Sequence, residues 1–319
     1  MGLRQIILVK DEIMKSINRF MEDEGFVQAF YQGISDASGS CEAVANVFIL
    51  KESSFLTLAQ TQQLLMEAEL INSDLPRMWT IGRSFRRDVK DDGRHLNDFA
   101  LMEYEGLDVD LYWLLAFNER LLGTIFQDIL RSNLLTREQS HKLYTHWKEW
   151  EYSENNGLIP YEGALELLKD NRFDIQWGDD LKREHEAALT KELGIVQVTH
   201  YPEEIKFFNM ARSRALSLSE GRSTVECVDV LLPNSGETIG GSEREYDYGI
   251  LRSKLESSTM LAQLKQLKEE HDSHGEEIMD AFEKYLDLFK DREVKRSGGG
   301  LGLGRLLQFV LDSPNIIPF

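Results

Sequence analysis

The stretch Phe85-Arg-Arg-Asp-Val-Lys-Asp-Asp-Gly-Arg-His-Leu-Asn-Asp-Phe99 is dense in charges of both signs and lies between two apolar segments. Those segments, Trp79 to Arg87 and Phe99 to Leu107, predict two strands joined by a turn-prone Asp-Asp-Gly. In an antiparallel hairpin the guanidiniums of Arg86 and Arg94, eight residues apart, converge on one polyanion. The hairpin therefore indicates a site for a nucleoside triphosphate.

Such a site needs planar cations for the phosphates, an acceptor for the amino group of the base and an apolar ring to stack on. Arg86, Arg94, Asp88 and Phe99 meet these needs. The alternative is an exposed hairpin with cross-strand ion pairs, which contribute little to stability. The hairpin alone does not separate the two interpretations.

A second cluster contains two acids, Asp229 and Glu237, at the two ends of the turn Pro233-Asn-Ser-Gly236. Two carboxylates placed in this way are able to share a Mg²⁺ ion that also binds phosphate oxygens. A hairpin with solvated acids is the alternative.

The third cluster is the glycine-rich run Gly298-Gly-Gly-Leu-Gly-Leu-Gly304, which predicts a turn before an apolar helix that carries Arg305. It does not fit a dinucleotide-binding fingerprint, because no strand is expected before it and no acid follows at the required distance. Arg305 on the first turn of the helix would supply a third cation.

Composition limits the classes of function. The chain has 319 residues, 42% of them hydrophobic, and a formal net charge of -19. That charge argues against DNA binding and does not favour a tRNA partner, because phosphate neutralisation needs a basic surface. Two lone cysteines, Cys41 and Cys227, and the lack of a long apolar run predict a cytoplasmic protein with no membrane contact.

Hydrophobic periodicity predicts an α+β fold with a mostly antiparallel sheet, because strands outnumber simple βαβ alternations. Residues 132–156 have no clear assignment. The other expected helices span residues 13–21, 63–70, 111–130, 161–170, 179–193, 251–268, 276–290 and the segment after Gly304. The other expected strands span residues 26–31, 48–50, 55–58, 195–198, 207–210 and 225–232. No linker interrupts the chain, so residues 1–319 are expected to form a single domain.

Taken together, these segments resemble the class II aminoacyl-tRNA synthetases of the aspartyl, asparaginyl and lysyl subgroup, and the asparaginyl members most. The hairpin resembles their motif 2, and Gly300 to Leu306 resembles motif 3. Further matching segments are Trp177 to Glu186, Tyr201 to Lys206 and Asp229 to Glu245. The resemblance implies a sheet of six to seven strands flanked by helices. It also suggests a catalytic domain without the N-terminal anticodon-binding domain of the family.

The resemblance implies activation of an amino acid by ATP and Mg²⁺, through an aminoacyl adenylate. By matching position, Arg86 would bind the α-phosphate, and Arg94 and Arg305 the rest of the triphosphate. The adenine would stack on Phe99 and donate to Asp88, and His95 belongs to the same motif. In this interpretation Asp229 and Glu237 bind the metal, and the catalytic residues are Arg86, Arg305 and Glu237.

For the amino acid, the resemblance matches Glu42 to the acid that pairs with the substrate ammonium and Gln63 to a pocket glutamine. Arg244 matches the arginine that meets the substrate side chain, and Met66 stands where aspartyl enzymes have a lysine. Loss of that lysine favours asparagine over aspartate, although an aspartate-like substrate remains an alternative.

The resemblance also implies a homodimer, although Gln32 replaces the proline that usually ends the strand at the family's interface. We expect transfer of the activated amino acid to an amine, ammonia or another non-tRNA acceptor. One alternative is a ligase that charges tRNA without its own anticodon domain. The other is a regulatory paralogue that has lost catalysis.

Overall fold

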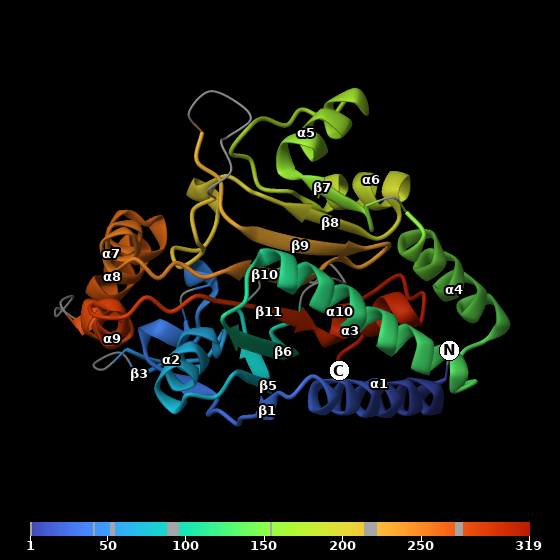
Figure 1. Ribbon diagram of the computed structural model, residues 1–319, viewed down its shortest axis with the longest axis horizontal. Coiled ribbons are helices and arrows are strands. Elements are labelled where there is room, and N and C mark those ends of the chain that lie inside the picture. The colour runs from blue at the N-terminus through green and yellow to red at the C-terminus, as the bar shows by residue number, and fades with distance from the viewer. Residues whose placement is uncertain are drawn as a thin grey trace.

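The computed structural model describes residues 2–40, 42–51, 55–87, 96–153, 155–213, 222–271 and 277–319. Eight of the described strands form one mixed sheet, in the order β1-β5-β6-β11-β10-β9-β8-β7 (Figure 1). Their bounds are β1 Val27–Gln28, β5 Arg77–Phe85, β6 Asp98–Leu107, β7 Leu158–Pro160, β8 Val196–Thr199, β9 Cys227–Leu232, β10 Gly236–Glu243 and β11 Arg296–Gly302.

The inner strands are antiparallel, as predicted, and only the outer pairs β1–β5 and β7–β8 are parallel. The sheet has more strands than the six or seven expected because both edges are extended by very short segments. The edge strand β1 has two residues and β7 has three.

The glycine-rich run predicted as a turn is in fact the strand β11, which lies between β6 and β10. A Cβ atom added to Gly298 would lie 2.2 Å from Cδ of Glu105 and 2.3 Å from the carbonyl oxygen of Tyr104. Glycine is therefore required here because neighbouring groups approach closely, and not because the chain turns. The helix that follows, α10 (Leu303–Val310), carries Arg305 as predicted.

One face of the main sheet is covered by α1 (Leu3–Asp23), α3 (Leu111–Arg131) and α10, which share its largest apolar core. Figure 1 shows α1 and α3 running along this side. The unassigned segment contains α4 (Arg137–Glu151), which begins with a capping box between Thr136 and Gln139. Its buried side chains are a narrow stripe within a polar sequence, which explains why periodicity did not reveal it: Leu143, Trp147 and Trp150.

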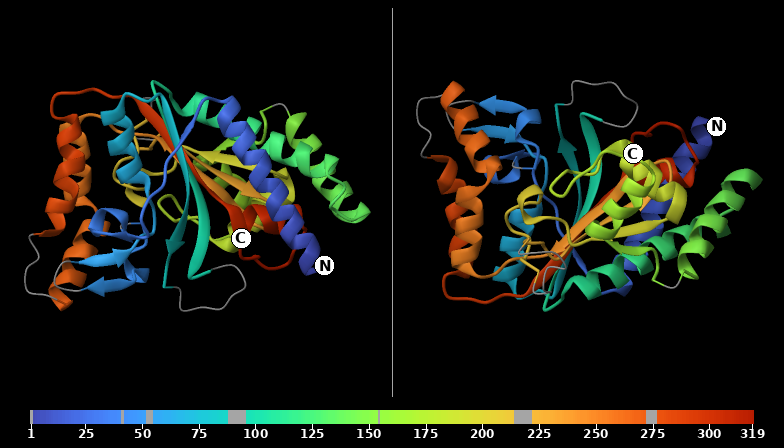
Figure 2. Two further views of the ribbon diagram at one scale, coloured as in Figure 1. Left: turned by 90° about the horizontal axis from the view of Figure 1, so that it is seen from below. Right: turned by 90° about the horizontal axis from the view of Figure 1, so that it is seen from above.

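The helices α5 (Tyr161–Asp170) and α6 (Arg183–Leu193) pack beside β8 and β9 in a second core. At the opposite end of the molecule, α2 (Gln63–Ser73) lies beside a small sheet and a helical group (Figures 1 and 2). The small sheet consists of β2 (Ile34–Ser35), β3 (Ile49–Lys51) and β4 (Leu56–Leu58). The helical group consists of α7 (Tyr248–Ser257), α8 (Thr259–His271) and α9 (Glu277–Leu286).

Two further predictions were wrong. The single helix expected over residues 251–268 is divided at Ser258, whose backbone is extended and separates α7 from α8. Residues 207–210 do not form a strand, because Met210 makes only an isolated bridge to Arg244. Aromatic residues favoured a strand there, but Phe208 instead packs against α9 through Phe282.

Candidate functional site

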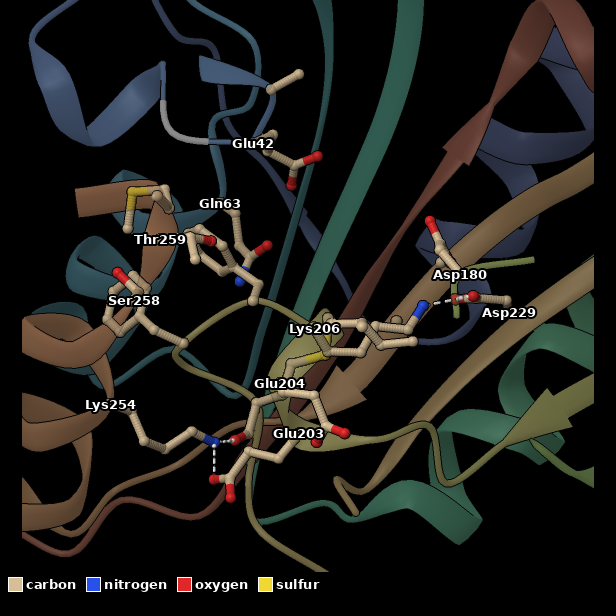
Figure 3. A pocket seen from close by; sticks show the side chains of 18 of the residues that line it. Glu42, Gln63, Asp180, Glu203, Glu204, Lys206, Asp229, Lys254, Ser258 and Thr259 are labelled. Atoms are coloured by element: carbon tan, nitrogen blue, oxygen red, sulfur yellow. Dashed lines mark hydrogen bonds and ion pairs between the residues drawn. The ribbon is translucent and has the colours of Figure 1, made fainter. Parts of the chain in front are cut away.

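A cavity of about 1200 Å³ opens on the face of the sheet opposite the largest core. Its floor comes from β6, β9, β10 and β11, and α7 and α8 form one wall. Figure 3 shows lining side chains from segments far apart in the sequence, among them Gln63, Asp229 and Lys254. Six residues singled out from the sequence line it: Glu42, Gln63, Arg86, Asp229, Glu237 and Arg244.

Arg86 lies just beyond β5, where its backbone N–H donates to the carbonyl of Asn97 and closes the predicted hairpin. Its guanidinium carbon lies 5.5 Å from the centre of the Phe99 ring, and its Nη2 donates to Oε2 of Glu42 at 2.8 Å. The Nε of Arg86 is buried and has no hydrogen-bond partner among the residues that the structure describes. This guanidinium therefore has an unused donor beside the cavity.

Three of the predicted ATP-binding residues, Asp88, Arg94 and His95, lie outside the described residues. Two others do not line the cavity themselves. Phe99 contacts it through Arg86, and Nη1 of Arg305 donates to the backbone carbonyl of Glu237 at 2.6 Å.

The two acids of the second cluster meet over Gly240, which pairs directly with Asp229 across β9 and β10. A Cβ atom at Gly240 would lie 2.9 Å from Oε1 of Glu237 and 3.7 Å from Oδ1 of Asp229. Burial raises the pKa of Asp229 to about 6, with the nearby Glu237 adding to the effect and Lys206 opposing it. The glycine thus leaves open the space into which both carboxylates project.

Among the residues expected to bind an amino acid, Gln63 lines the cavity and donates through Nε2 to Oε1 of Glu67 at 2.9 Å. Glu42 lines it as well, already paired with Arg86. Met66 does not. It is completely buried one helical turn before Leu70 and packs there against Met78, because its position on α2 faces the core. The structure therefore places Met66 outside the lining of the cavity.

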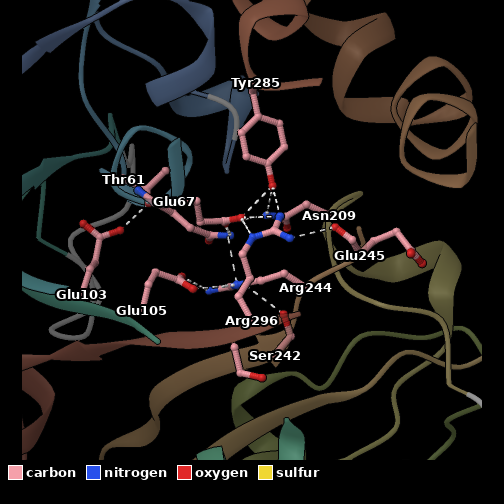
Figure 4. Close-up of polar contacts among 12 residues, drawn as sticks. Thr61, Glu67, Glu103, Glu105, Asn209, Ser242, Arg244, Glu245, Tyr285 and Arg296 are labelled. Carbon is pink, nitrogen blue, oxygen red and sulfur yellow. Dashed lines mark hydrogen bonds and ion pairs between the residues drawn. The ribbon is translucent and has the colours of Figure 1, made fainter. Parts of the chain in front are cut away.

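Arg244 lies in the cavity wall but its charge is already paired (Figure 4). Nη2 lies 2.5 Å from Oε1 of Glu105, Nε lies 3.7 Å from Oε1 of Glu67, and Nη1 donates to Ser242. The side chain is 3% exposed. A buried arginine with two carboxylate neighbours has little positive charge left for a further anion.

Behind Arg244 lies a buried polar network that the sequence did not reveal. Nη2 of Arg296 lies 2.7 Å from Oε2 of Glu67, the hydroxyl of Tyr285 donates to the same oxygen at 2.7 Å, and Asn209 donates to Oε1. Burial opposes ionisation of Glu67, but Arg296 and Arg244 together lower its pKa. The network connects α2, which carries Gln63, to α9, which carries Tyr285.

Two of the missed acids, Glu103 and Glu105, did leave a signal in the sequence. They alternate with Met102 and Tyr104 along β6, and alternate residues of a strand face opposite sides of the sheet. The apolar pair faces the main core and the acids face the cavity. Acids on the inner face of a predicted strand indicate a polar site.

No group of three or more described His, Cys, Asp or Glu side chains has the arrangement of a complete metal site. None of the described helices is both long and apolar enough to cross a membrane.

Comparison with known proteins identifies the family. Residues 2–318 match the family described as tRNA synthetases class II (D, K and N). The asparagine–tRNA ligase of Thermococcus kodakarensis is 30% identical over 98% of this chain and 67% of its own length. The asparaginyl-tRNA synthetase of Mus musculus is 29% identical over 100% of this chain and 67% of its own length.

Among solved structures, asparaginyl-tRNA synthetase from Pyrococcus horikoshii complexed with asparaginyl-adenylate superimposes with a TM-score of 0.76 at 28% identity. The match covers 98% of this chain and 66% of that one. The chain thus spans about two thirds of the length of the relatives it matches. The chain belongs to the class II tRNA synthetases of the D, K and N group.

Proposed function

We propose that the cavity binds ATP and an amino acid and joins them as an aminoacyl adenylate, as expected of an AMP-forming ligase. The observation that carries this proposal is the meeting of Arg86, Asp229 and Glu237 with Gln63 and Arg244 in one cavity. The similarity to a synthetase whose structure contains asparaginyl-adenylate supports it.

In the proposed reaction, an oxygen of the amino acid carboxylate attacks the α-phosphorus of ATP, the bond to the β-phosphate oxygen breaks, and pyrophosphate leaves. Arg86 binds the α-phosphate through the guanidinium that now holds Glu42, and Phe99 stacks on the adenine. Arg305 holds the backbone of Glu237 and reaches the triphosphate from α10. The fixed positive charge of Arg86 stabilises the charge that develops on the phosphate. The roles of Asp88, Arg94 and His95 remain expectations from the sequence.

The donors over Gly240 suit a divalent metal ion, because Asp229 and Glu237 present carboxylate oxygens and Mg²⁺ prefers oxygen ligands. When bound there, Mg²⁺ supplies positive charge that offsets the charge of the triphosphate. Asp229 and Glu237 would hold it in the same cavity as the phosphate-binding arginine.

The amino acid we propose is asparagine. Glu42 and Gln63 would receive the ammonium group, and Arg244 would meet the side chain. Because Glu105 and Glu67 balance the charges of Arg244 and Arg296, a second carboxylate from aspartate would enter a site with no net positive charge. The neutral amide of asparagine avoids the cost of burying a carboxylate without an opposite charge.

For the acceptor, the relatives favour tRNA, since they are named asparagine–tRNA ligases. The non-tRNA acceptor expected from the sequence gains no support from them, and neither does a silent paralogue. Acid-precipitable charging of bulk tRNA with radioactive asparagine tests this acceptor. Absence of charging by a protein that forms the adenylate would return the choice to an amine or ammonia.

We further propose one catalytic domain that associates as a homodimer through α1 and β1. Apolar side chains on and next to these elements are exposed in the single chain: Leu3 72%, Ile7 55%, Val27 44% and Phe30 82%. An apolar surface of this kind is typical of an interface. Light scattering should give twice the mass of one chain, and a monomeric mass at micromolar concentration would exclude this interface.

Amino-acid-dependent exchange of radioactive pyrophosphate into ATP tests the proposed chemistry. We expect exchange with asparagine in the presence of Mg²⁺ and much slower exchange with aspartate. Faster exchange with aspartate would refute the assignment of the amino acid, and no exchange with either, or with their analogues, would refute adenylation.

A further inference from the structure

Lys206 is a buried cation in the part of the cavity that we assign to the metal. Its Nζ lies 2.5 Å from Oδ2 of Asp229, and the two side chains are only 14% and 10% exposed. Figure 3 shows the ammonium directed at Asp229, with Asp180 close by. Burial raises the pKa of Asp180, Lys206 opposes that shift and Glu237 adds to it, so all these charges interact.

The ammonium is fixed from a second side by an aromatic ring. Nζ of Lys206 lies 3.8 Å from the centre of the Tyr201 ring, within the range of a cation–π interaction. The ion pair with Asp229 and the Tyr201 ring together fix the ammonium in one position.

The charges of this group match one divalent cation. Three carboxylates, Asp180, Asp229 and Glu237, and one ammonium leave a net charge of two minus. The ammonium of Lys206 pairs with Oδ2 of Asp229. The other oxygen, Oδ1, lies on the side of Gly240, and so does Oε1 of Glu237. The ion pair thus leaves one oxygen of each carboxylate directed at the same space.

We propose that Lys206 is a positioning residue that acts through Asp229. Its ammonium holds the carboxylate of Asp229 with Oδ1 facing Glu237. In the ATP-free protein the positive charge of Lys206 offsets part of the negative charge of the carboxylates, as the metal ion does when it is bound. The ammonium weakens the attraction that the three carboxylates exert on a divalent cation that arrives alone. The negative charge of the triphosphate adds to this attraction, so the cation binds more tightly together with ATP. This inference rests on the proposed function, because it takes Asp229 and Glu237 as metal ligands.

Titration with Mn²⁺, followed by electron paramagnetic resonance in the absence of nucleotide, tests the inference. Lys206→Met removes both the competing charge and the contact that orients Asp229, and we expect the loss of charge to dominate, so Mn²⁺ should bind this variant about tenfold more tightly than the wild type. Lys206→Arg keeps the charge and should behave as the wild type.

Lys254→Met is the matched control. Lys254 lines the same cavity with a side chain 9% exposed, but its Nζ pairs with Glu203 at 3.1 Å rather than with a proposed metal ligand. Its removal should leave Mn²⁺ affinity unchanged. An equal rise in Mn²⁺ affinity in Lys206→Met and Lys254→Met would show that the effect comes from the overall charge of the cavity. That result would overturn the proposal.

A thermal measurement covers the case in which Lys206→Met folds poorly, since it leaves Asp229 buried without its cation. Mn²⁺ should raise the melting temperature of Lys206→Met, or of the milder Lys206→Gln, more than that of the wild type. Equal shifts in variant and wild type would contradict the inference.

Titration of the wild-type protein with Mn²⁺ in the presence of ATP distinguishes failure of the proposed metal site from failure of the proposed role of Lys206. If Mn²⁺ does not bind even then, the metal site of the proposed function fails and Lys206 has no such role. If it binds with ATP but Lys206→Met gains no affinity without ATP, only the inference about Lys206 fails.

Discussion

At the scale of single residues, the ion pair between Arg86 and Glu42 couples the two proposed substrates. The two side chains are 31% and 33% exposed and are assigned to different substrates, so each must leave the other when its substrate binds. Glu42→Gln frees Arg86, and we expect ATP alone to bind this variant up to about fivefold more tightly, since a partly exposed pair contributes about 1 kcal/mol or less. Binding of asparagine should weaken in the same variant.

Isothermal titration with ATP measures this effect, and Glu204→Gln is its control. Glu204 lines the same cavity, so its neutralisation changes the overall charge equally without freeing Arg86. ATP binding by Glu42→Gln that is no tighter than ATP binding by the wild type would contradict the coupling.

The buried acid Glu103 predicts a pH dependence of stability. Burial raises its pKa to about 7, although Thr61 and the backbone of Gln62 donate hydrogen bonds to it. The folded protein then binds a proton more tightly than the unfolded chain, so the free energy of unfolding falls as pH rises from about 5 to about 7. Urea titrations should show a loss on the order of 2 kcal/mol for the wild type and a smaller one for Glu103→Gln. An equal pH dependence in both proteins would mean that Glu103 does not titrate in this window.

At the scale of elements, the central strand β11 depends on glycine at one position and not at another. Gly298→Ala would place a methyl group 2.2 Å from Glu105, so the backbone must shift, at a cost of about 1–3 kcal/mol. Gly300→Ala in the same strand meets its nearest atom, on Leu101, at 3.5 Å. Urea unfolding should show a clearly lower stability for Gly298→Ala alone, and equal losses would refute the packing argument.

The same strand shows where sequence reasoning succeeds for elements and where it fails. The hairpin of β5 and β6 and the helix α3 follow from local periodicity, because one face of each is apolar. The glycines of β11 carry no such periodicity, since what they fit is the approach of Glu105 and Tyr104 from a strand far away in the chain. Local pattern therefore predicts a turn where the fold requires a central strand.

At the scale of the whole molecule, sequence patterns predicted the fold class and the convergence of several cavity residues. The hairpin of β9 and β10 brings Asp229 and Glu237 together, whereas the resemblance implied that Arg86, at the separate hairpin of β5 and β6, shares their site. Sequence patterns missed the network around Glu67, because its partner Arg296 is separated from it by 229 positions. The resemblance assigned Met66 to the amino acid, whereas in the structure its position on α2 faces the core.

The central claim is that this cavity builds an adenylate around Arg86, and the rate of pyrophosphate exchange with asparagine in Arg86→Ala tests it most directly. Arg83→Ala is the matched variant, since Arg83 lies in the same hairpin but is exposed and paired with Asp98. We predict a loss on the order of 100-fold or more for Arg86→Ala and a near wild-type rate for Arg83→Ala. A wild-type rate in Arg86→Ala would contradict the account.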